Sequence, residues 1–468
     1  MRQAKTTAQG ILIIPMGEGM CATLLHPVAV VHRERCGRVS QGWLSACAAE
    51  RASTRGLMEL IMEPLNLMRS YRKVLSNAGS AGVDGMSVKE LRGWLRSNYG
   101  CLKQQLEQGI YKPEAVREVE IPKAGGGVRK LGIPTVIDRL IQQAIHQILS
   151  IGYEPTFSES SYGFRPQRGA HHALRQGCRY VSGGKKVIVD LDLERFFDRV
   201  NHDRLMWLLS RRIGDTRVLR LIRSYLQSGI MRGGLTSQRT EGTPQGSPLS
   251  PLLSNIVLDE LDKELERRGL SYVRYADDVK IFVSSEVAAI RVKHRVTEYI
   301  TTKLKLKVNE QKSRICKGHE LNFLGHSLLK DGTLGLSKQS EAKLKSKVKQ
   351  ITRRNRGVNM DQMIRELHIA LKGWLQYFRF ARMRKKMDVI DGWIRRKLRC
   401  VRLKQCKRTI GIVRWLRSLG MAEKRSWLTA LSGKGWWRIS NTPAVNEAMN
   451  IEWFVNQGYY SLSLHYNR

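Results

Sequence analysis

The stretch "RYADDVKIFV", residues 274–283, places two adjacent carboxylates, Asp277 and Asp278, between two short apolar runs. The alternation of apolar and polar residues predicts a β-hairpin with the two acids at its tip. Two like charges held this close repel each other and raise each other's pKa unless a divalent cation neutralises them. The stretch therefore predicts a metal site at a hairpin tip, although paired aspartates also occur in ordinary turns.

A second group of acids follows an apolar run in "VIVDLDLERFFDRV", residues 187–200. This stretch predicts a buried strand that changes to a helix around Asp192. A carboxylate at the end of that strand would complete a set of oxygen ligands, the kind that Mg²⁺ prefers. Two such ions activate an attacking 3′-hydroxyl and stabilise a leaving pyrophosphate, so the acids predict nucleotidyl transfer.

The composition indicates a polyanionic partner. The 468 residues include 81 Lys and Arg against 41 Asp and Glu, a formal net charge of +40. A surface of one sign repels itself unless a polyanion lies against it, and nucleic acid is the commonest such partner. The eight cysteines include no C-x-x-C pair, which argues against a zinc finger or a disulfide framework. No apolar run approaches the roughly 18 residues of a membrane span, so we expect a soluble protein.

The periodicity of the sequence divides the chain into segments. Residues 1–56 show none, and three interpretations stay open: a flexible, disordered N-terminal extension, upstream sequence read in frame, or an organelle-type presequence, since acids are few there. Residues 57–75 carry apolar side chains at helical spacing, and residues 116–135 predict two strands joined by a glycine turn. Beyond Gly335 the chain becomes helical and strongly basic, and residues 364–378 place apolar side chains on one stripe that predicts a core.

The order of the motifs resembles that of reverse transcriptases of the bacterial group II intron type. "SYGFRPQRGAHHAL", "VIVDLDLERFFDRVNHDRL" and "GTPQGSPLSPLLSNIVLDELD" precede "YADD", and "LKLKVNEQKS" and "LNFLGH" follow it. The resemblance covers roughly residues 57–468. It implies a right-hand polymerase of class α/β plus all-α, with fingers, a palm built on an antiparallel sheet, and a helical thumb that includes the maturase region called domain X.

The resemblance also implies where the domains lie. We expect an extension at 1–56, N-terminal helices and fingers at 57–185, the palm with part of the fingers at 186–335, the thumb and domain X at 336–408, and a C-terminal maturase-type segment at 409–468. Paired cysteines and a His-Asn-His nuclease signature are missing from the sequence. We therefore expect no HNH endonuclease domain.

Residue by residue, the resemblance implies a catalytic and metal-binding set of Asp192, Asp277 and Asp278. Asp192 matches the first carboxylate by its distance from the two phenylalanines, while Asp190, on the same face of the strand, competes for the role. Phe197 matches the residue that packs under the sugar of the incoming nucleotide and would collide with a 2′-hydroxyl. The neighbouring Phe196 fits a core position better.

The resemblance implies further contacts to the nucleoside triphosphate. Lys123 and Arg129 lie across the glycine turn from each other and match cations that close on the phosphates. Gln245 and Gly246, in the rigid loop "TPQGSPLSP", match residues that touch the nucleotide and the templating pair. Lys312 matches a lysine near the triphosphate, or it forms a salt bridge to the palm.

A further group of cations is expected to bind nucleic acid. Arg165 and Arg168 precede a helix and fit contacts to a template or primer backbone, whereas the nearby His171 and His172 lack a third ligand for a metal. The C-terminal cations of this group are Lys345, Lys349, Arg353, Arg354, Arg395, Arg396, Lys397 and Arg399. Their density matches domain X, which in the family grips structured intron RNA.

Together the motifs imply a group II intron-encoded RNA-directed DNA polymerase and maturase, which binds its intron RNA, assists splicing and copies the intron into DNA during retrohoming. The resemblance implies two Mg²⁺ ions, with Mn²⁺ as a substitute, and as partners the intron RNA, an RNA template with a DNA primer, target DNA and deoxynucleoside triphosphates. It implies a cytoplasmic protein that associates with the nucleoid when bound to DNA. Two alternatives stay open: a reverse transcriptase taken over by its host for repair or defence, and an RNA-binding splicing factor whose polymerase is inactive.

Overall fold

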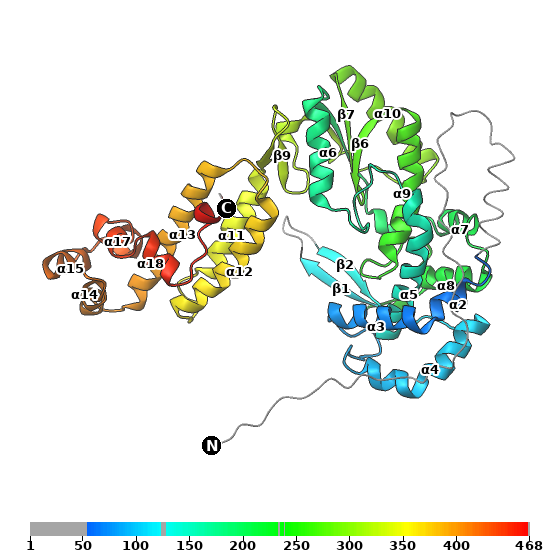
Figure 1. The fold of residues 1–468 in the computed structure, drawn as a ribbon, viewed down its shortest axis with the longest axis horizontal. Coiled ribbons are helices and arrows are strands. Elements are labelled where there is room, and N and C mark those ends of the chain that lie inside the picture. Colours follow the sequence, from blue (N-terminus) through cyan, green and yellow to red (C-terminus); the bar gives the residue numbers. More distant parts are fainter. Residues whose placement is uncertain (1–53, 123–127, 233–234, 238, 467–468) are drawn as a thin grey trace, which may run out of the picture. The chain divides into compact units, whose positions relative to one another are not determined.

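The structure, a computed structural model, describes residues 54–122, 128–232, 235–237 and 239–466 (Figure 1). The expectations for residues 1–53 and for Lys123 lie outside these ranges. The first elements are α2 (Leu57–Met62), α3 (Pro64–Asn77), α4 (Leu91–Gln108), β1 (Val116–Pro122), β2 (Val128–Ile133), α5 (Val136–Tyr153), η1 (Glu154–Thr156) and α6 (Ala170–Ser182). The helical stretch at 57–75 is divided in two, because Pro64 lacks the N–H that would continue α2 and instead begins α3.

The middle of the chain forms the sheets. Its elements are β3 (Val187–Asp192), η2 (Phe196–Asp198), α7 (His202–Ser210), α8 (Thr216–Gln227), β4 (Ile230–Arg232), β5 (Leu235–Ser237), α9 (Ser250–Arg267), β6 (Ser271–Tyr275), β7 (Asp278–Val283), α10 (Glu286–Thr302), β8 (Arg314–Lys317), η3 (Gly318–Glu320), β9 (His326–Leu328) and β10 (Leu334–Leu336). One sheet has the order β6-β7-β3-β8 and is antiparallel throughout. A second has the order β2-β1-β4-β5, with β1 and β4 parallel, and β9 pairs with β10.

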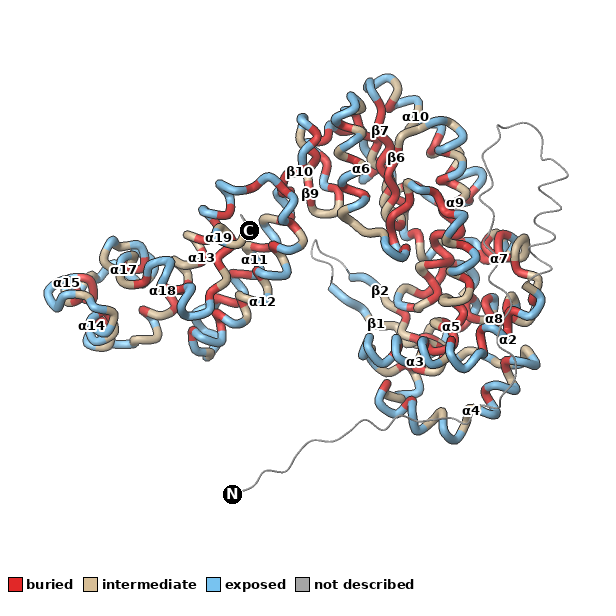
Figure 2. The backbone as a smooth tube through the Cα atoms, viewed as in Figure 1, coloured by how far each residue is buried: buried red, intermediate tan, exposed pale blue. Residues whose placement is uncertain are grey.

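The antiparallel sheet β6-β7-β3-β8 is buried on both faces, which explains the apolar run of its central strand β3. Val189 and Leu191 belong to a core that includes side chains of α9 and α10, whereas Ile188 points to the opposite face and joins a core with α6. Figure 1 shows β6 and β7 between α6 and α10, and Figure 2 shows both strands buried along most of their length. Since side chains alternate along a strand, Asp190 and Asp192 share the face of Ile188.

The expected change from strand to helix around Asp192 is wrong in detail. Strand β3 does end at Asp192, but Arg195 then takes a left-handed backbone conformation (φ +47°), which an α-helix does not accommodate. Only the short 3₁₀ turn η2 follows, and α7 begins at His202, where the Asn201 side chain accepts the N–H of Arg204. The turn buries the Phe196 side chain and leaves Phe197 half-buried.

The C-terminal part of the chain is helical. Its elements are α11 (Lys338–Ile351), α12 (Met360–Phe378), α13 (Arg384–Gln405), α14 (Thr409–Ser418), α15 (Glu423–Ala430), α16 (Gly435–Ile439), α17 (Pro443–Ala448), α18 (Ile451–Asn456) and α19 (Leu462–Tyr466). The predicted apolar stripe of α12 is buried, from Ile364 to Phe378. None of the helices in the described ranges combines the length and the apolar character needed to cross a bilayer.

One buried carboxylate joins the C-terminal residues to α13. Asp391 is fully buried and accepts hydrogen bonds from the hydroxyls of Tyr459 (2.7 Å), Ser461 (2.7 Å) and Ser463 (2.9 Å). It also accepts the backbone N–H groups of Leu462 and Ser463, at 3.0 and 2.8 Å. Because a buried charge is stable only when its hydrogen bonds are made, Asp391 determines where α19 begins.

We expect Asp391→Ala to release the segment 459–463, since it leaves several buried donors without an acceptor. The free energy of local opening should fall by about 3 kcal/mol, which amide hydrogen exchange of this segment would measure. Asp388→Ala, at an exposed position of the same helix, is the control and should change exchange little. Equal exchange in the two variants would contradict the anchoring role of Asp391.

Candidate functional site

The predicted hairpin is present, and its tip is a two-residue turn. Tyr275 in β6 pairs with Asp278 in β7, so Ala276 and Asp277 form the turn. Ala276 has φ +58°, a conformation that costs energy for a residue with a Cβ atom. Gly163 lies directly against this turn, because a Cβ atom added to Gly163 would overlap the Ala276 backbone nitrogen. The position of Asp277 is therefore restricted by backbone packing.

Asp192 lies beside the hairpin tip at the end of the neighbouring strand. It pairs with Asp278 in the register of β3 and β7, and its side chain is 44% exposed. Its carbonyl accepts the N–H of Asn309 at 2.8 Å, which fixes the strand end. The Lys312 ammonium lies 3.8 Å from the Asp192 carboxylate and is itself exposed, so it forms the predicted salt bridge and stays accessible from solvent.

A buried lysine neutralises two of the acids. Lys280, opposite Asp190 in the register, donates from its ammonium to the carboxylates of Asp190 and Asp278. Burial alone would lower the pKa of Lys280, but the two carboxylates raise it above its ordinary value, so the ammonium stays charged. Arg314 lies 3.7 Å from the other oxygen of Asp190. Asp190 is thus engaged by two cations, which favours Asp192 for the metal-binding role.

The other two acids, Asp192 and Asp277, lie close enough for the charge of Asp192 to act on Asp277. Burial raises the pKa of Asp277, and the charge of Asp192 raises it further, while Arg129 and Lys280 act in the opposite direction. Among the residues that the structure describes, no three His, Cys, Asp or Glu side chains converge closely enough to hold a metal ion. Mg²⁺ in polymerase-type sites is commonly held by one or two carboxylates together with substrate phosphates. Asp192 and Asp277 fit this requirement, whereas Asp278 is bonded to Lys280.

Two predicted nucleotide-binding residues come together from distant parts of the sequence. The Arg129 Nε in β2 donates to the Gln245 side-chain oxygen at 2.7 Å, and the Gly132 N–H donates to the Gln245 carbonyl at 2.9 Å. Gly246 has φ +117°, and a Cβ atom there would lie 3.0 Å from the Gly132 carbonyl oxygen. Only glycine fits both the backbone conformation and this close approach. Ser247 is buried and donates to Gln142 at 2.5 Å, so its hydroxyl is engaged inside the protein.

Phe197 lies at the edge of the hydrophobic core that contains Phe196. Its ring packs edge-on against Phe196, with ring centroids 5.4 Å apart, and stays half-buried while Phe196 is buried. The carbonyl of Phe197 accepts the N–H of Thr243 at 2.6 Å, which joins it to the loop of Gln245. The partly accessible ring of Phe197 is therefore the one to which the family resemblance gives the contact with the sugar of the nucleotide.

The expected nucleic-acid contact by Arg165 is not supported. Its side chain is 3% exposed, and the guanidinium donates to Glu154 (2.8 Å) and to the carbonyls of Ser158 (2.5 Å) and Ser161 (2.9 Å). A guanidinium used up by protein acceptors has no donor for a phosphate, so Arg165 is a structural residue in this conformation. Arg168 pairs with the exposed Glu159 and lines a surface pocket that includes further arginines of α6.

Arg399 requires the same correction. It is buried, donates to the Met449 carbonyl at 2.7 and 3.0 Å and to Asn446, and burial lowers its pKa to about 10. The other predicted cations of this region are at least partly exposed: Lys345, Lys349, Arg353, Arg354, Arg395, Arg396 and Lys397. Lys345 pairs with Glu341, and Arg396 lies over the Trp437 ring at 4.0 Å.

Three of these cations form a cluster between α11 and α13. Burial lowers the pKa of Lys397, and the charges of Lys349 and Arg354 lower it further, so both of these cations lie close enough to act on Lys397. Lys397 also lies 5.4 Å from the Trp393 ring centroid. Cations that repel one another are stabilised by an anion placed between them. We call Lys349, Arg354 and Lys397 the α11–α13 basic cluster.

The sequence analysis missed Lys280 and the buried partners of Arg274. Lys280 lies two residues after Asp278, and side-chain alternation along a strand was the signal that would have placed the two on one face. Arg274 opens the stretch that predicted the hairpin, but its partner Asp262 lies on another element, and no local pattern joins them. Both residues are buried cations, and the partner of Arg274 is one that only tertiary contacts reveal.

Comparison with known families assigns a class to this arrangement. Residues 121–328 match the family model of the reverse transcriptases, RNA-dependent DNA polymerases, and residues 342–418 match the maturase-specific domain of group II introns. The first match contains the antiparallel sheet with Asp192, Asp277 and Asp278, and the second contains α12 and α13. The protein is therefore a reverse transcriptase with a maturase-specific domain.

Individual relatives agree with the two matches. The chain is 31% identical over 357 residues to protein YkfC of Escherichia coli, covering 67% of this chain and 92% of YkfC. It is 30% identical over 338 residues to the group II intron-encoded protein LtrA of Lactococcus lactis, covering 58% of this chain and 56% of LtrA. It is 32% identical over 220 residues to the putative COX1/OXI3 intron 2 protein of Saccharomyces cerevisiae, covering 47% of this chain and 25% of that protein.

The chain belongs to the group II intron reverse transcriptase and maturase family. It spans about half the length of LtrA. The expected fold class, a reverse transcriptase with an antiparallel sheet and a helical C-terminal region, is confirmed.

We expect Lys280→Met to destabilise the protein by about 3 kcal/mol at pH 8, because the buried ammonium is the hydrogen-bond donor to both Asp190 and Asp278. Burial already raises the pKa of Asp278, and loss of Lys280 raises it further. When the pKa of a carboxyl is higher in the folded protein than in the unfolded protein, the folded protein loses stability as the pH rises above the unfolded pKa of about 4. The destabilisation by Lys280→Met should therefore be smaller at pH 5 than at pH 8. Urea unfolding at the two pH values measures it.

Lys312→Met is the control for this variant. Lys312 is 69% exposed and lies at 3.8 Å from its acid, so the loss of its charge should change the free energy of unfolding by less than about 1 kcal/mol at either pH. A Lys280→Met protein whose stability is lost equally at pH 5 and pH 8 would contradict the charge-neutralising role.

Proposed function

We propose that this protein copies RNA into DNA at the end of the β3–β7 strand pair and that it binds group II intron RNA, assists its splicing and reverse-transcribes it during retrohoming. The observation that carries the proposal is the juxtaposition of Asp192 and Asp277 at the open end of the sheet, inside the reverse transcriptase match. The domain boundaries that accompany the proposal are N-terminal helices and fingers at 57–185, the palm with part of the fingers at 186–335, the thumb and domain X at 336–408, and a C-terminal maturase-type segment at 409–468.

In this proposal, Asp192 and Asp277 hold divalent cations through their carboxylates. Bound Mg²⁺, with Mn²⁺ as a substitute, supplies activation of the primer 3′-hydroxyl and stabilisation of the leaving pyrophosphate. Asp278 is the third proposed ligand, through the carboxylate oxygen other than the one that accepts the Lys280 ammonium. Burial raises the pKa of Asp277 and the charge of Asp192 raises it further, which supports a cation shared by these two acids.

The incoming nucleotide is held by residues that surround these acids. Arg129, oriented by Gln245, presents a guanidinium to the triphosphate, and its charge already acts on Asp277. Lys123 and Gly246 also contact the incoming nucleotide in this proposal. Phe197 excludes ribonucleotides by the partly exposed side of its ring, and Lys312 beside Asp192 donates a proton to pyrophosphate or pairs with its charge.

RNA is bound by cations that the structure leaves accessible. We assign this role to Arg168 at the pocket of α6, to Lys345, Arg353, Arg395 and Arg396, and above all to the α11–α13 basic cluster. These side chains fit contacts to phosphates, which provide affinity without reading sequence. The similarity to LtrA, a group II intron-encoded protein, supports intron RNA as the ligand.

Asp277→Asn tests the polymerase assignment. We expect Mg²⁺-dependent primer extension to fall at least about 100-fold, since a metal supplies several kcal/mol of charge stabilisation, while RNA affinity stays within about 3-fold. Asp278→Asn is the matched variant and should lose less activity, because its partner is Lys280. Extension on an RNA template, with filter binding beside it, measures both. Near-normal activity of Asp277→Asn would remove this residue from the site.

A triple variant tests the maturase assignment. Changing Lys349, Arg354 and Lys397 to Gln should weaken intron RNA binding and flatten its salt dependence by roughly 0.7–0.9 of a log–log slope unit for each phosphate that is no longer neutralised. Protein-assisted splicing should fall with it, whereas extension on a short template should suffer less. The control removes the same charge from three exposed residues, Arg291 and Arg295 in α10 and Lys303 directly after it. Equal effects of the two triple variants would contradict a specific role for the cluster.

A further inference from the structure

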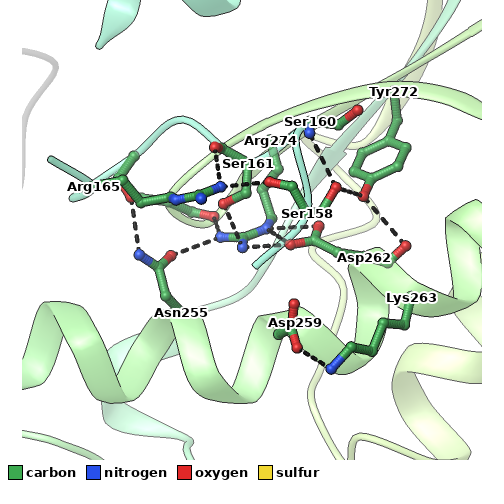
Figure 3. A network of polar contacts seen from close by, with 12 residues as sticks. Ser158, Ser160, Ser161, Arg165, Asn255, Asp259, Asp262, Lys263, Tyr272 and Arg274 are labelled. Carbon is green, nitrogen blue, oxygen red and sulfur yellow. Dashed lines mark hydrogen bonds and ion pairs between the residues drawn. The ribbon is translucent and has the colours of Figure 1, made fainter. Parts of the chain in front are cut away.

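The hairpin that carries Asp277 is held from the inside by one buried ion pair. Arg274 in β6 and Asp262 in α9 are both fully buried. The Arg274 Nε donates to the two Asp262 oxygens at 2.8 and 2.9 Å, and Nη2 donates to one of them at 2.5 Å. Figure 3 shows the guanidinium above α9, surrounded by polar groups from several segments.

Every donor of this guanidinium has an acceptor. Nη1 donates to the Asn255 side-chain oxygen and to the Ala276 carbonyl, both at 3.0 Å, and Nη2 also donates to the Ser161 hydroxyl at 2.7 Å. Since arginine has five N–H donors, none is left for a substrate or a phosphate. The contacts of Arg274 instead join α9, the segment around Ser161 and the hairpin turn.

The bond to the Ala276 carbonyl is the one that concerns Asp277. This carbonyl belongs to the peptide group that joins Ala276 to Asp277, and because a peptide group is planar, holding its oxygen also orients the Asp277 backbone. Ala276 has φ +58°, a conformation that a non-glycine residue keeps only when its surroundings enforce it. The guanidinium is the buried donor that opposes relaxation of this turn.

The opposite side of the turn is restricted by the same network. Gly163 lies against the Ala276 nitrogen, and its carbonyl accepts the Asn255 amide at 3.0 Å. Asn255 therefore contacts both Arg274 and the residue that backs the turn. Two backbone bonds, from Arg274 N–H to the Ser160 carbonyl and from Tyr162 N–H to the Arg274 carbonyl, each 2.9 Å, join the two segments.

We propose that Arg274, held by Asp262 and Asn255, is a positioning residue that sets where the Asp277 carboxylate stands relative to Asp192. This inference rests on the proposed function, because it assumes that the two acids share a cation. Arg274 acts through the Ala276–Asp277 peptide and contacts neither the cation nor the nucleotide. A small displacement of the turn would change the distance between the two carboxylates and so the affinity for the cation.

Arg274→Lys is the direct test. An ammonium keeps the charge opposite Asp262 but lacks the planar fork, so it cannot reach Asp262, Asn255 and the Ala276 carbonyl together. We expect kcat for primer extension to fall about 10- to 100-fold, as for other misplaced catalytic groups. The Mg²⁺ concentration at half-maximal rate should rise several-fold, and so should the dissociation constant for Mn²⁺, measured on the protein without nucleotide by electron paramagnetic resonance, while KM for the primer–template stays near that of the wild type. Rates are measured well below the melting temperature of each variant.

Two further variants separate positioning from stability. Asn255→Ala leaves the Arg274–Asp262 pair intact and should raise the Mg²⁺ concentration at half-maximal rate by a smaller factor. If Arg274→Lys fails to fold, this variant tests the positioning role in its place. Asp215→Asn breaks another buried pair, to Arg217, on the α8 side of the protein. It should lower the melting temperature but leave the Mg²⁺ concentration at half-maximal rate unchanged.

The outcomes are distinct. A wild-type protein without Mg²⁺-dependent extension would overturn the proposed function and this inference with it. An active wild type beside variants of Arg274 and Asn255 with unchanged kcat and Mg²⁺ dependence would overturn the positioning role alone. An equal rise in the Mg²⁺ requirement of Asp215→Asn would also overturn it, because the effect would then follow from destabilisation.

Discussion

Electrostatic repulsion at the end of a buried sheet is the constraint on which the site depends. Strands β3 and β7 bring Asp190, Asp192 and Asp278 onto one face, and the turn adds Asp277. Uncompensated charges in such a place would destabilise the fold by several kcal/mol. The protein neutralises one pair with the Lys280 ammonium, deeper in the sheet, and leaves Asp192 and Asp277 at the open end. Asp278 lies opposite Asp192 in the strand register, so the two pairs of acids differ in the cation beside them rather than in depth.

Close backbone contacts hold the loops around these acids. Gly163 touches the hairpin turn, Gly246 touches the end of β2, and a Cβ atom at Gly242 would lie 2.8 Å from the backbone of Asp198. Glycine allows such approach because it has no side chain, and at Gly242 and Gly246 it also accepts the positive φ. The ion pair of Arg274 with Asp262 adds a buried charge pair whose disruption typically costs about 3–5 kcal/mol. These contacts hold together residues that are far apart in the sequence.

The large positive charge of the chain is not distributed as the sequence alone suggests. Arg165, Arg274 and Arg399 are buried and satisfy their donors within the protein, so their charges stabilise loops and helix ends. The accessible cations that repel one another, the α11–α13 basic cluster, are the ones that gain most from a polyanion. Charge density in a segment therefore predicts the kind of partner, while burial determines which cations reach it.

The sequence by itself determined the hairpin of "YADD", the buried strand before Asp192, the strand pair around Arg129, the apolar stripe of α12 and the family, because each rests on local periodicity or on a motif of neighbouring residues. The tertiary structure alone decided that Asp278 is bonded to Lys280, that Arg129 contacts Gln245, that Arg165 and Arg399 are buried, and that Asp262 supports the hairpin. It also replaced the helix expected after Asp192 by a left-handed turn. Periodicity indicates which face of an element is apolar. The partner of a polar side chain instead depends on elements that the fold brings together across the chain. The free energy of such pairs comes from burial, which no short stretch of sequence specifies.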